Sequence, residues 1–237
     1  MNKQSNLYTV IYIIVLVLIV GTGLAFAALS LKEKQTENAD NDKRRQILAS
    51  VGVSVPENEL VSEFNRLIVS QVVLNEAGDS IGADAFAVNV AQQSKIPAAS
   101  RELPLYVCNI DGSTKYIIPL YGAGLWGPIW GYVSLNDNGS TVYGAFFDHQ
   151  GETPGLGAEI TKPDFYSQFS GKELFKNGQF LPIAVVKKGQ KPAGDEDYVD
   201  GISGGTITSK GVGAMLDSSL TPYKAYLDRI AAENAEK

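Results

Sequence analysis

The chain has 237 residues and a net charge of −6, with 44% hydrophobic and 19% charged residues. This length suits one domain of good size or two small ones, and the composition excludes wholesale disorder. The single cysteine and single histidine exclude an internal disulfide and a cysteine cluster for zinc or iron–sulfur, so we expect no metal site. The acidic balance argues against general nucleic-acid binding.

A long apolar segment lies near the N-terminus. No charged residue occurs from Leu7 to Leu31, a stretch longer than the ~20 apolar residues of a bilayer-spanning helix. We therefore expect residues 1–31 to form a transmembrane anchor. A cleaved signal peptide is the alternative, since Ala25–Ala27 resembles a cleavage site, but the apolar run exceeds the ~7–15 residues of a signal core.

The flanking charges leave open which side of the membrane the rest of the chain faces. Only Lys3 precedes the apolar segment, whereas Lys32, Lys34 and the Lys-Arg-Arg run at 43–45 follow it, mixed with acidic residues. The count of Lys and Arg slightly favours the cytoplasm, although long domains are often translocated regardless of such charges.

Residues 32–55 are predicted to connect the anchor to a single domain over 56–237. Pro56 suits the first position of a helix, and apolar residues recur at helical spacing up to residue 75, so we expect a helix over 55–75. Residues 76–104 show no clear pattern.

The next part of the chain favours strands. β-Branched and aromatic residues are frequent in 115–120, 129–135 and 141–147, and Asn136–Gly139 is turn chemistry typical of a hairpin. A further strand is expected over 181–186.

The last part of the chain favours helices, over 214–220 and from Thr221-Pro222 to about residue 232. Hairpins mixed with helices, with no regular βαβ alternation, predict an α+β fold: a mostly antiparallel sheet flanked by helices, after one N-terminal helix.

Small residues are densest from Asp200 to Gly211. Glycines let the backbone approach a ligand, the hydroxyls supply donors and acceptors, and a helix starting near Ser209 would favour an anion such as phosphate. An ordinary Gly/Ser loop is the alternative, and neither a Walker loop nor a dinucleotide-binding Gly-x-Gly-x-x-Gly fingerprint is found.

This stretch resembles the Asp-Gly-x-Ser/Thr-Gly-Ala-Thr signature on which a flavin transferase attaches FMN covalently. The match covers Asp200, Gly201, Ser203, Gly204 and Thr206. In that family the last threonine carries FMN through its phosphate, which implies Thr206 here. Gly205 stands where the family usually has alanine, and the added backbone freedom is expected to leave attachment intact.

Two further stretches resemble the same covalent FMN-binding family. His149–Gly157 is similar to its flavin-pocket segment, and Gly124–Gly131 is similar to a stretch found in the C subunits of sodium-translocating NADH:quinone reductases. Beyond Thr206, the resemblance implies a further set of cofactor-binding residues. These are Asp200, Gly201, Ser203, Gly204, Gly205, Thr208, Glu152, Thr153, Gly155 and Leu156.

The resemblance implies a covalent flavoprotein subunit of a sodium-translocating NADH:quinone reductase. Because the sequence has no nicotinamide-binding fingerprint, we expect this subunit to relay electrons and not to oxidise NADH itself. Its implied partners are other subunits of a membrane redox complex that ends at quinone, a flavin transferase for maturation, and the membrane. It places the chain in the bacterial inner membrane as a single-pass protein with its domain outside the cytoplasm. The alternatives are the G subunit of the related complex coupling ferredoxin and NAD, and an anchored binding module without redox function.

Other conspicuous residues have simpler explanations. Trp126 and Trp130 are expected as core or interface aromatics, and His149 as a loop histidine with its hydrogen bonds satisfied. Cys108 is expected to be a small buried side chain, and Lys187 and Lys188 to be solvated. No residue is assigned a catalytic role.

Overall fold

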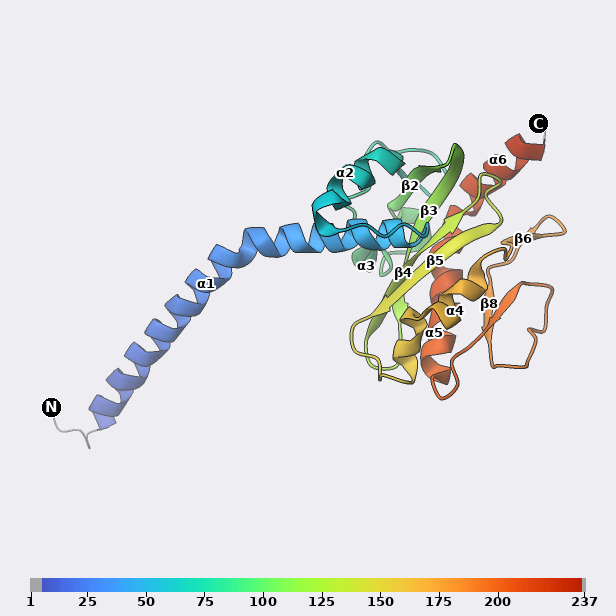
Figure 1. Ribbon diagram of the computed structural model, residues 1–237. Coiled ribbons are helices and arrows are strands. Elements are labelled where there is room, and N and C mark those ends of the chain that lie inside the picture. Colours follow the sequence, from blue (N-terminus) through green and yellow to red (C-terminus); the bar gives the residue numbers. More distant parts are fainter. Residues whose placement is uncertain (1–5, 236–237) are drawn as a thin grey trace. The chain divides into compact units, whose positions relative to one another are not determined.

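The fold was analysed in a computed structural model, which describes residues 6–235 (Figure 1). The chain divides into two units, one up to Lys43 and one from Arg44 to Lys237. The first helix, α1 (Asn6–Ala49), contributes to both.

From Asn6 to Lys43 the first unit is helical, and its surface is apolar from Leu7 to Leu31. Its large apolar side chains are exposed, from 43% for Ile11 to 75% for Phe26. The helix is long and apolar enough to cross a membrane. The predicted division into 1–31, 32–55 and 56–237 depends on where a membrane lies along this helix.

A five-stranded antiparallel sheet forms the centre of the second unit, in the order β1-β2-β3-β4-β5 (Figure 1). Its strands are β1 (Ile68–Leu74), β2 (Leu103–Ile110), β3 (Ser113–Ala123), β4 (Pro128–Leu135) and β5 (Val142–His149). The three strands predicted over 115–147 and the hairpin at 136–139 are confirmed, and Gly139 has the positive φ that such a turn requires.

Both faces of the sheet are buried, as the alternation of side chains along the strands shows. Leu105 and Ile118 belong to one core cluster, which also contains residues of the C-terminal helices. Their neighbours Tyr106 and Ile117 belong to the other cluster, which is covered by α2 (Glu57–Leu67) and the last turn of α1. The predicted α+β class, with helices flanking an antiparallel sheet, is confirmed.

The helix predicted over 55–75 is correct only in its first half. Leu60, Phe64 and Leu67 face the core from α2, but residues 68–74 form β1, which pairs with β2. This segment is rich in β-branched residues and aliphatic on both faces. Backbone pairing with a neighbouring strand therefore overrides its helical spacing.

Short elements lie in the connection between β1 and β2 and in the segment between β5 and the C-terminal helices. They are α3 (Val90–Gln93), η1 (Ala98–Ser100), η2 (Gly157–Thr161), α4 (Pro163–Tyr166), η3 (Ser167–Phe169), β6 (Phe175–Lys176), β7 (Gln179–Phe180), β8 (Ala184–Val186) and β9 (Tyr198–Asp200). The chain ends with α5 (Thr206–Leu220), η4 (Thr221–Tyr223) and α6 (Lys224–Ala235). The strand expected over 181–186 is shorter than predicted, and β8 pairs in parallel with β9.

Helix α5 packs closely on β3, which fixes the position of its N-terminus. A side chain on Gly122 would meet Met215, with 2.7 Å to its Cβ, and one on Gly211 would meet the carbonyl of Ala123. Glycines at these positions therefore allow the helix and strand backbones to approach each other.

Candidate functional site

The small-residue loop connects a strand to a helix. Asp200 is the last residue of β9, residues 201–205 form the turn, and Thr206 is the first residue of α5. The helix thus begins at Thr206, three residues before the start near Ser209 that was considered from the sequence. Thr206 is exposed on its first turn. The free N–H groups at a helix N-terminus favour a phosphate at this position.

Two glycines of the loop are required by its geometry. Gly204 has a φ of +77°, and a Cβ there would lie 2.6 Å from Cδ2 of Leu156. Gly205 is buried at the N-cap of α5, where no side chain caps the helix, and a Cβ would lie 3.1 Å from Ile202 and 3.2 Å from the backbone nitrogen of Gly157. The loop therefore packs directly on segment 152–157.

A buried serine holds the loop in shape. Ser209 Oγ accepts a hydrogen bond from the backbone N–H of Ile202 at 2.8 Å and donates one to the carbonyl of Gly205 at 2.9 Å. The hydroxyls of Thr206 and Ser203 are on exposed residues instead. The Ser209 hydroxyl therefore stabilises the loop, whereas Ser203 and Thr206 are exposed to solvent.

A cavity of about 510 Å³ opens beside the loop. Its lining combines apolar side chains, such as Val185 and Ile202, with lysines at exposed positions. The lining residues are Val185, Val186, Lys187, Lys188, Gln190, Gly201, Ile202, Ser203, Gly204, Thr206, Ser209 and Lys210. Lys187 and Lys188 are exposed, as predicted.

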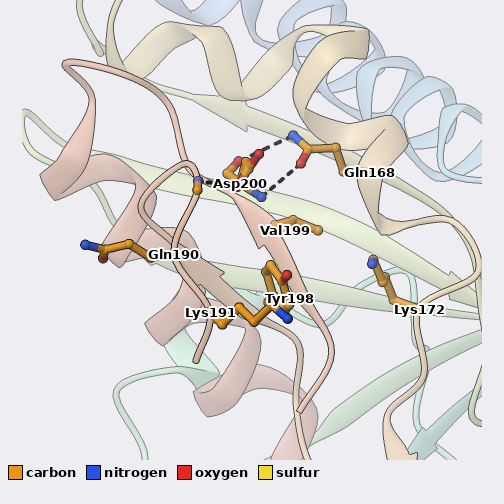
Figure 2. A pocket seen from close by; sticks show the side chains of 8 residues that line it. Gln168, Lys172, Gln190, Lys191, Tyr198, Val199 and Asp200 are labelled. Atoms are coloured by element: carbon orange, nitrogen blue, oxygen red, sulfur yellow. Dashed lines mark hydrogen bonds between the residues drawn. The ribbon is translucent and has the colours of Figure 1, made fainter. Parts of the chain in front are cut away.

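Asp200 is held by internal contacts. Its carboxylate accepts a hydrogen bond from the backbone N–H of Gly189 at 3.4 Å, and its backbone is bound by the side chain of Gln168 (Figure 2). The geometry therefore gives the Asp200 carboxylate a structural contact with the preceding turn.

Glu152 joins three segments of the site beneath its surface. Its side chain is 4% exposed and accepts hydrogen bonds from the backbone N–H of Trp126 at 2.9 Å and from the Thr208 hydroxyl at 2.5 Å. Side chains on Gly124 or Gly157 would collide with this carboxylate. The side chains of Glu152 and Thr208, both predicted to bind the cofactor, therefore bind each other.

The environment of Glu152 favours its ionised form. Burial acts to raise its pKa, but the hydrogen bonds from Thr208 and from the backbone of Trp126 and Leu125 outweigh burial and lower the pKa below its ordinary value. A buried carboxylate with several donors is a stable anchor for the segments around it.

This pKa shift predicts a pH-dependent contribution to stability. Because the pKa of Glu152 is lower in the folded chain than the ordinary value of about 4.3, the contribution is complete above that value and is lost as the pH falls through the folded-state pKa. Glu152→Gln should therefore lower the free energy of unfolding by about 2 kcal/mol at pH 7, with a smaller deficit near pH 4. Urea denaturation of both chains at the two pH values measures this difference. An equal deficit at both values would contradict it.

The other residues of the 152–157 segment lie at the surface. Thr153 and Leu156 are exposed, and Gly155 adopts a positive φ of +75° in the turn between them. Ile207, on the first turn of α5, is 56% exposed although it is aliphatic, and Leu156 is 42% exposed. These two side chains supply exposed apolar surface close to the loop in sequence and in space, Leu156 next to Gly204 and Ile207 next to Thr206.

Comparisons with known proteins assign the chain to a family. A family model described as the FMN-binding domain matches residues 124–221. The C subunit of the Na(+)-translocating NADH-quinone reductase of Vibrio anguillarum is 36% identical over 201 residues, covering 76% of each chain. The corresponding subunit of Pseudomonas aeruginosa is 33% identical over 238 residues, covering 91% of each. The chain belongs to the family of these C subunits.

A solved structure shows the same fold. The crystal structure of the C subunit from Parabacteroides distasonis is 51% identical, with a TM-score of 0.79, and the match covers 83% of this chain and 96% of that one. The resemblance of the motifs to the C-subunit family is thus confirmed over most of the chain.

The structure also places residues of this family member that were not predicted to bind the cofactor. His149 Nδ1 accepts the backbone N–H of Glu152 at 3.1 Å, and Cys108 is buried, which raises its pKa to about 11; both agree with the predictions. Trp126 is 69% exposed, so it is not a core residue. Sequence patterns gave no signal for Gln168, because it lies 32 residues from Asp200.

Proposed function

We propose that this chain is a membrane-anchored subunit that carries FMN covalently on Thr206 and relays electrons within a sodium-translocating NADH-quinone reductase. The observation that carries the proposal is the position of Thr206. It is an exposed hydroxyl on the first turn of α5, next to a cavity, inside the flavinylation signature and inside the region that matches the FMN-binding domain.

The residues around Thr206 fit FMN. Bound FMN supplies the redox chemistry, while the protein supplies position and electrostatics. The phosphate would lie at the N-terminus of α5, where no side chain caps the helix. The Thr153 hydroxyl and the backbone of 152–157 would contact the polar edge of the ring, with Leu156 against its face.

Attachment requires a transferase and an activated flavin. A threonine hydroxyl has no intrinsic activation, so its attachment to a phosphate requires another enzyme. A flavin dinucleotide would serve as donor: the bond from Thr206 Oγ to the FMN phosphorus forms, the pyrophosphate bond breaks, and adenosine monophosphate leaves. The hydroxyl proton passes to a base on the transferase.

The chain's place in the complex follows from what its sequence contains. It has no nicotinamide-binding fingerprint, so NADH would be oxidised by another subunit, and electrons would pass through this chain toward quinone. The identity of the electron donor tests this place in the complex. In the purified complex, NADH should reduce the flavin of this chain without ferredoxin. Reduction by ferredoxin alone would favour the G subunit of the related complex, and no reduction by either would contradict electron relay.

The proposed topology has residues 1–31 spanning the inner membrane, a connector over 32–55, and the FMN domain over 56–237 outside the cytoplasm. The single native cysteine, Cys108, is buried, so a cysteine introduced by Ala232→Cys at an exposed site should be labelled alone. A membrane-impermeant maleimide added to intact spheroplasts should label this variant and leave the parent chain unlabelled. Labelling only after the inner membrane is broken would contradict the proposed side.

A further inference from the structure

A glutamine outside the flavinylation signature holds the point where the signature begins. Gln168 lies on η3, and its Oε1 accepts the backbone N–H of Asp200 at 2.9 Å. Its Nε2 donates to the Asp200 carbonyl at 3.3 Å and to the carbonyl of Asp164 at 2.9 Å. Figure 2 shows the side-chain amide facing the Asp200 backbone, so that it takes the place of a neighbouring strand.

The glutamine is itself on a fixed support. The next residue, Phe169, is buried, and its ring packs against Phe147 at 5.0 Å and Phe165 at 5.5 Å between centroids. Gln168 is only partly buried, and it lines a cavity of about 490 Å³ together with Tyr198 and Asp200 of β9 (Figure 2). Its amide therefore presents two polar groups at a defined position at the edge of the core.

Both edges of β9 are thereby held at its last residue. On one edge β9 pairs with β8, and the N–H of Gly201 donates to the carbonyl of Val186 at 2.6 Å. On the other edge only Gln168 is seen to contact the Asp200 backbone among the described residues. Since five residues separate Asp200 from Thr206, the position of Asp200 constrains the path of the loop to the attachment hydroxyl.

We propose that Gln168 is a positioning residue for flavin attachment. It fixes the start of the 200–206 loop and so keeps the loop in the conformation that the transferase binds. This inference rests on the proposed attachment of FMN to Thr206. Gln168 takes no part in the bond changes, because its contacts are with Asp200 and Asp164 and not with Thr206.

Loss of Gln168 should change the KM of flavin attachment and leave its kcat nearly unchanged. If the loop is ordered before binding, losing Gln168 lowers the fraction of chains in the binding-competent conformation, and the apparent affinity for the transferase falls by that fraction. Once bound, the loop is ordered by the transferase, so the maximal rate is retained. The expected result is a rise of about tenfold in the KM for this chain, with the kcat of attachment within about twofold.

The experiment uses the full chain, purified in detergent from cells without transferase and then mixed with transferase and a flavin dinucleotide. Initial rates of covalent flavin incorporation, read from in-gel fluorescence, are measured against chain concentration. The variants are Gln168→Met, which keeps the length of the side chain but removes the amide, and Gln168→Glu, which keeps an acceptor for the Asp200 N–H but puts a carboxylate oxygen in place of the donor to the Asp200 and Asp164 carbonyls. Both should raise the KM. Gln179→Ala, a change at an exposed glutamine of β7, is the matched control.

The outcomes separate this inference from the proposed function. Equal KM values for wild type, Gln168→Met and Gln168→Glu would overturn the positioning role, as would an equal rise in KM for Gln179→Ala. A fall in melting temperature with unchanged kinetics per folded chain would show a structural role only, and would overturn the inference too. If wild type itself incorporates no flavin, the proposed attachment fails, whatever the variants do.

Discussion

Thr206→Val should abolish covalent flavin on this chain. The substitution keeps the shape and β-branching of the side chain but removes its hydroxyl, the atom proposed to bond the phosphate. Because the residue is exposed on the first turn of α5, the change in the free energy of unfolding should stay within about 0.5 kcal/mol. The chain should fold and assemble while electron transfer through the complex is lost. In-gel fluorescence after denaturation, with co-expressed transferase, measures the attached flavin.

The neighbouring hydroxyls are the controls for Thr206→Val. Thr208→Val removes the buried hydrogen bond to Glu152 and Ser209→Ala removes the bonds that shape the loop, so each should cost about 1–3 kcal/mol of stability while leaving the linkage in place. Fluorescence that persists in Thr206→Val but disappears in Thr208→Val would move the attachment site by two residues.

Gly157→Ala should produce the largest loss of stability among single methyl additions at this site. A Cβ at Gly157 would overlap the carboxylate of Glu152 and the hydroxyl of Thr208, the two groups whose hydrogen bond joins segment 152–157 to α5. Overpacking costs about 1–3 kcal/mol, and the loss of a hydrogen bond to a buried charge adds about 1.5–3 kcal/mol. We expect a loss of about 3 kcal/mol and reduced flavin loading. Denaturation followed by tryptophan fluorescence measures the stability.

Gly151→Ala is the matched control, because a Cβ there meets nothing within 4 Å. It should change the free energy of unfolding by no more than about 0.5 kcal/mol. In the Gly157→Ala background, adding Thr208→Ala should cost much less than Thr208→Ala alone, since the hydrogen bond to Glu152 is already broken. Additive costs, or equal effects at the two glycines, would contradict the role assigned to the Glu152–Thr208 pair.

Local sequence signals predicted the parts of the fold that depend on local chemistry. The hairpin at Asn136–Gly139 and the strands beside it follow from turn residues and β-branched runs. The strand at 68–74 could not be predicted in the same way. Its apolar residues continue the spacing of α2, and only pairing with β2, some 35 residues later, decides between helix and strand.

The same difference between local signals and contacts of distant segments applies to the candidate site. Thr206, the residue proposed to carry FMN, and its neighbouring glycines lie within one continuous signature, so the sequence could place Thr206 beside a loop. The contacts that support the loop come from distant segments. Glu152 lies 56 residues from its partner Thr208, and Gln168 lies 32 residues from Asp200. No spacing rule connects residues so far apart, and the direction of the Glu152 carboxylate depends on the packing of Gly124 and Gly157 around it.

The most direct test of covalent flavin attachment is the mass of the purified chain and of its peptides. The chain, co-expressed with a flavin transferase and denatured before measurement, should carry the added mass of one FMN, and fragmentation should locate that mass on Thr206. An unmodified mass with active transferase present would contradict the proposal that this chain is a covalent flavoprotein. A flavin mass on any other residue would contradict the site.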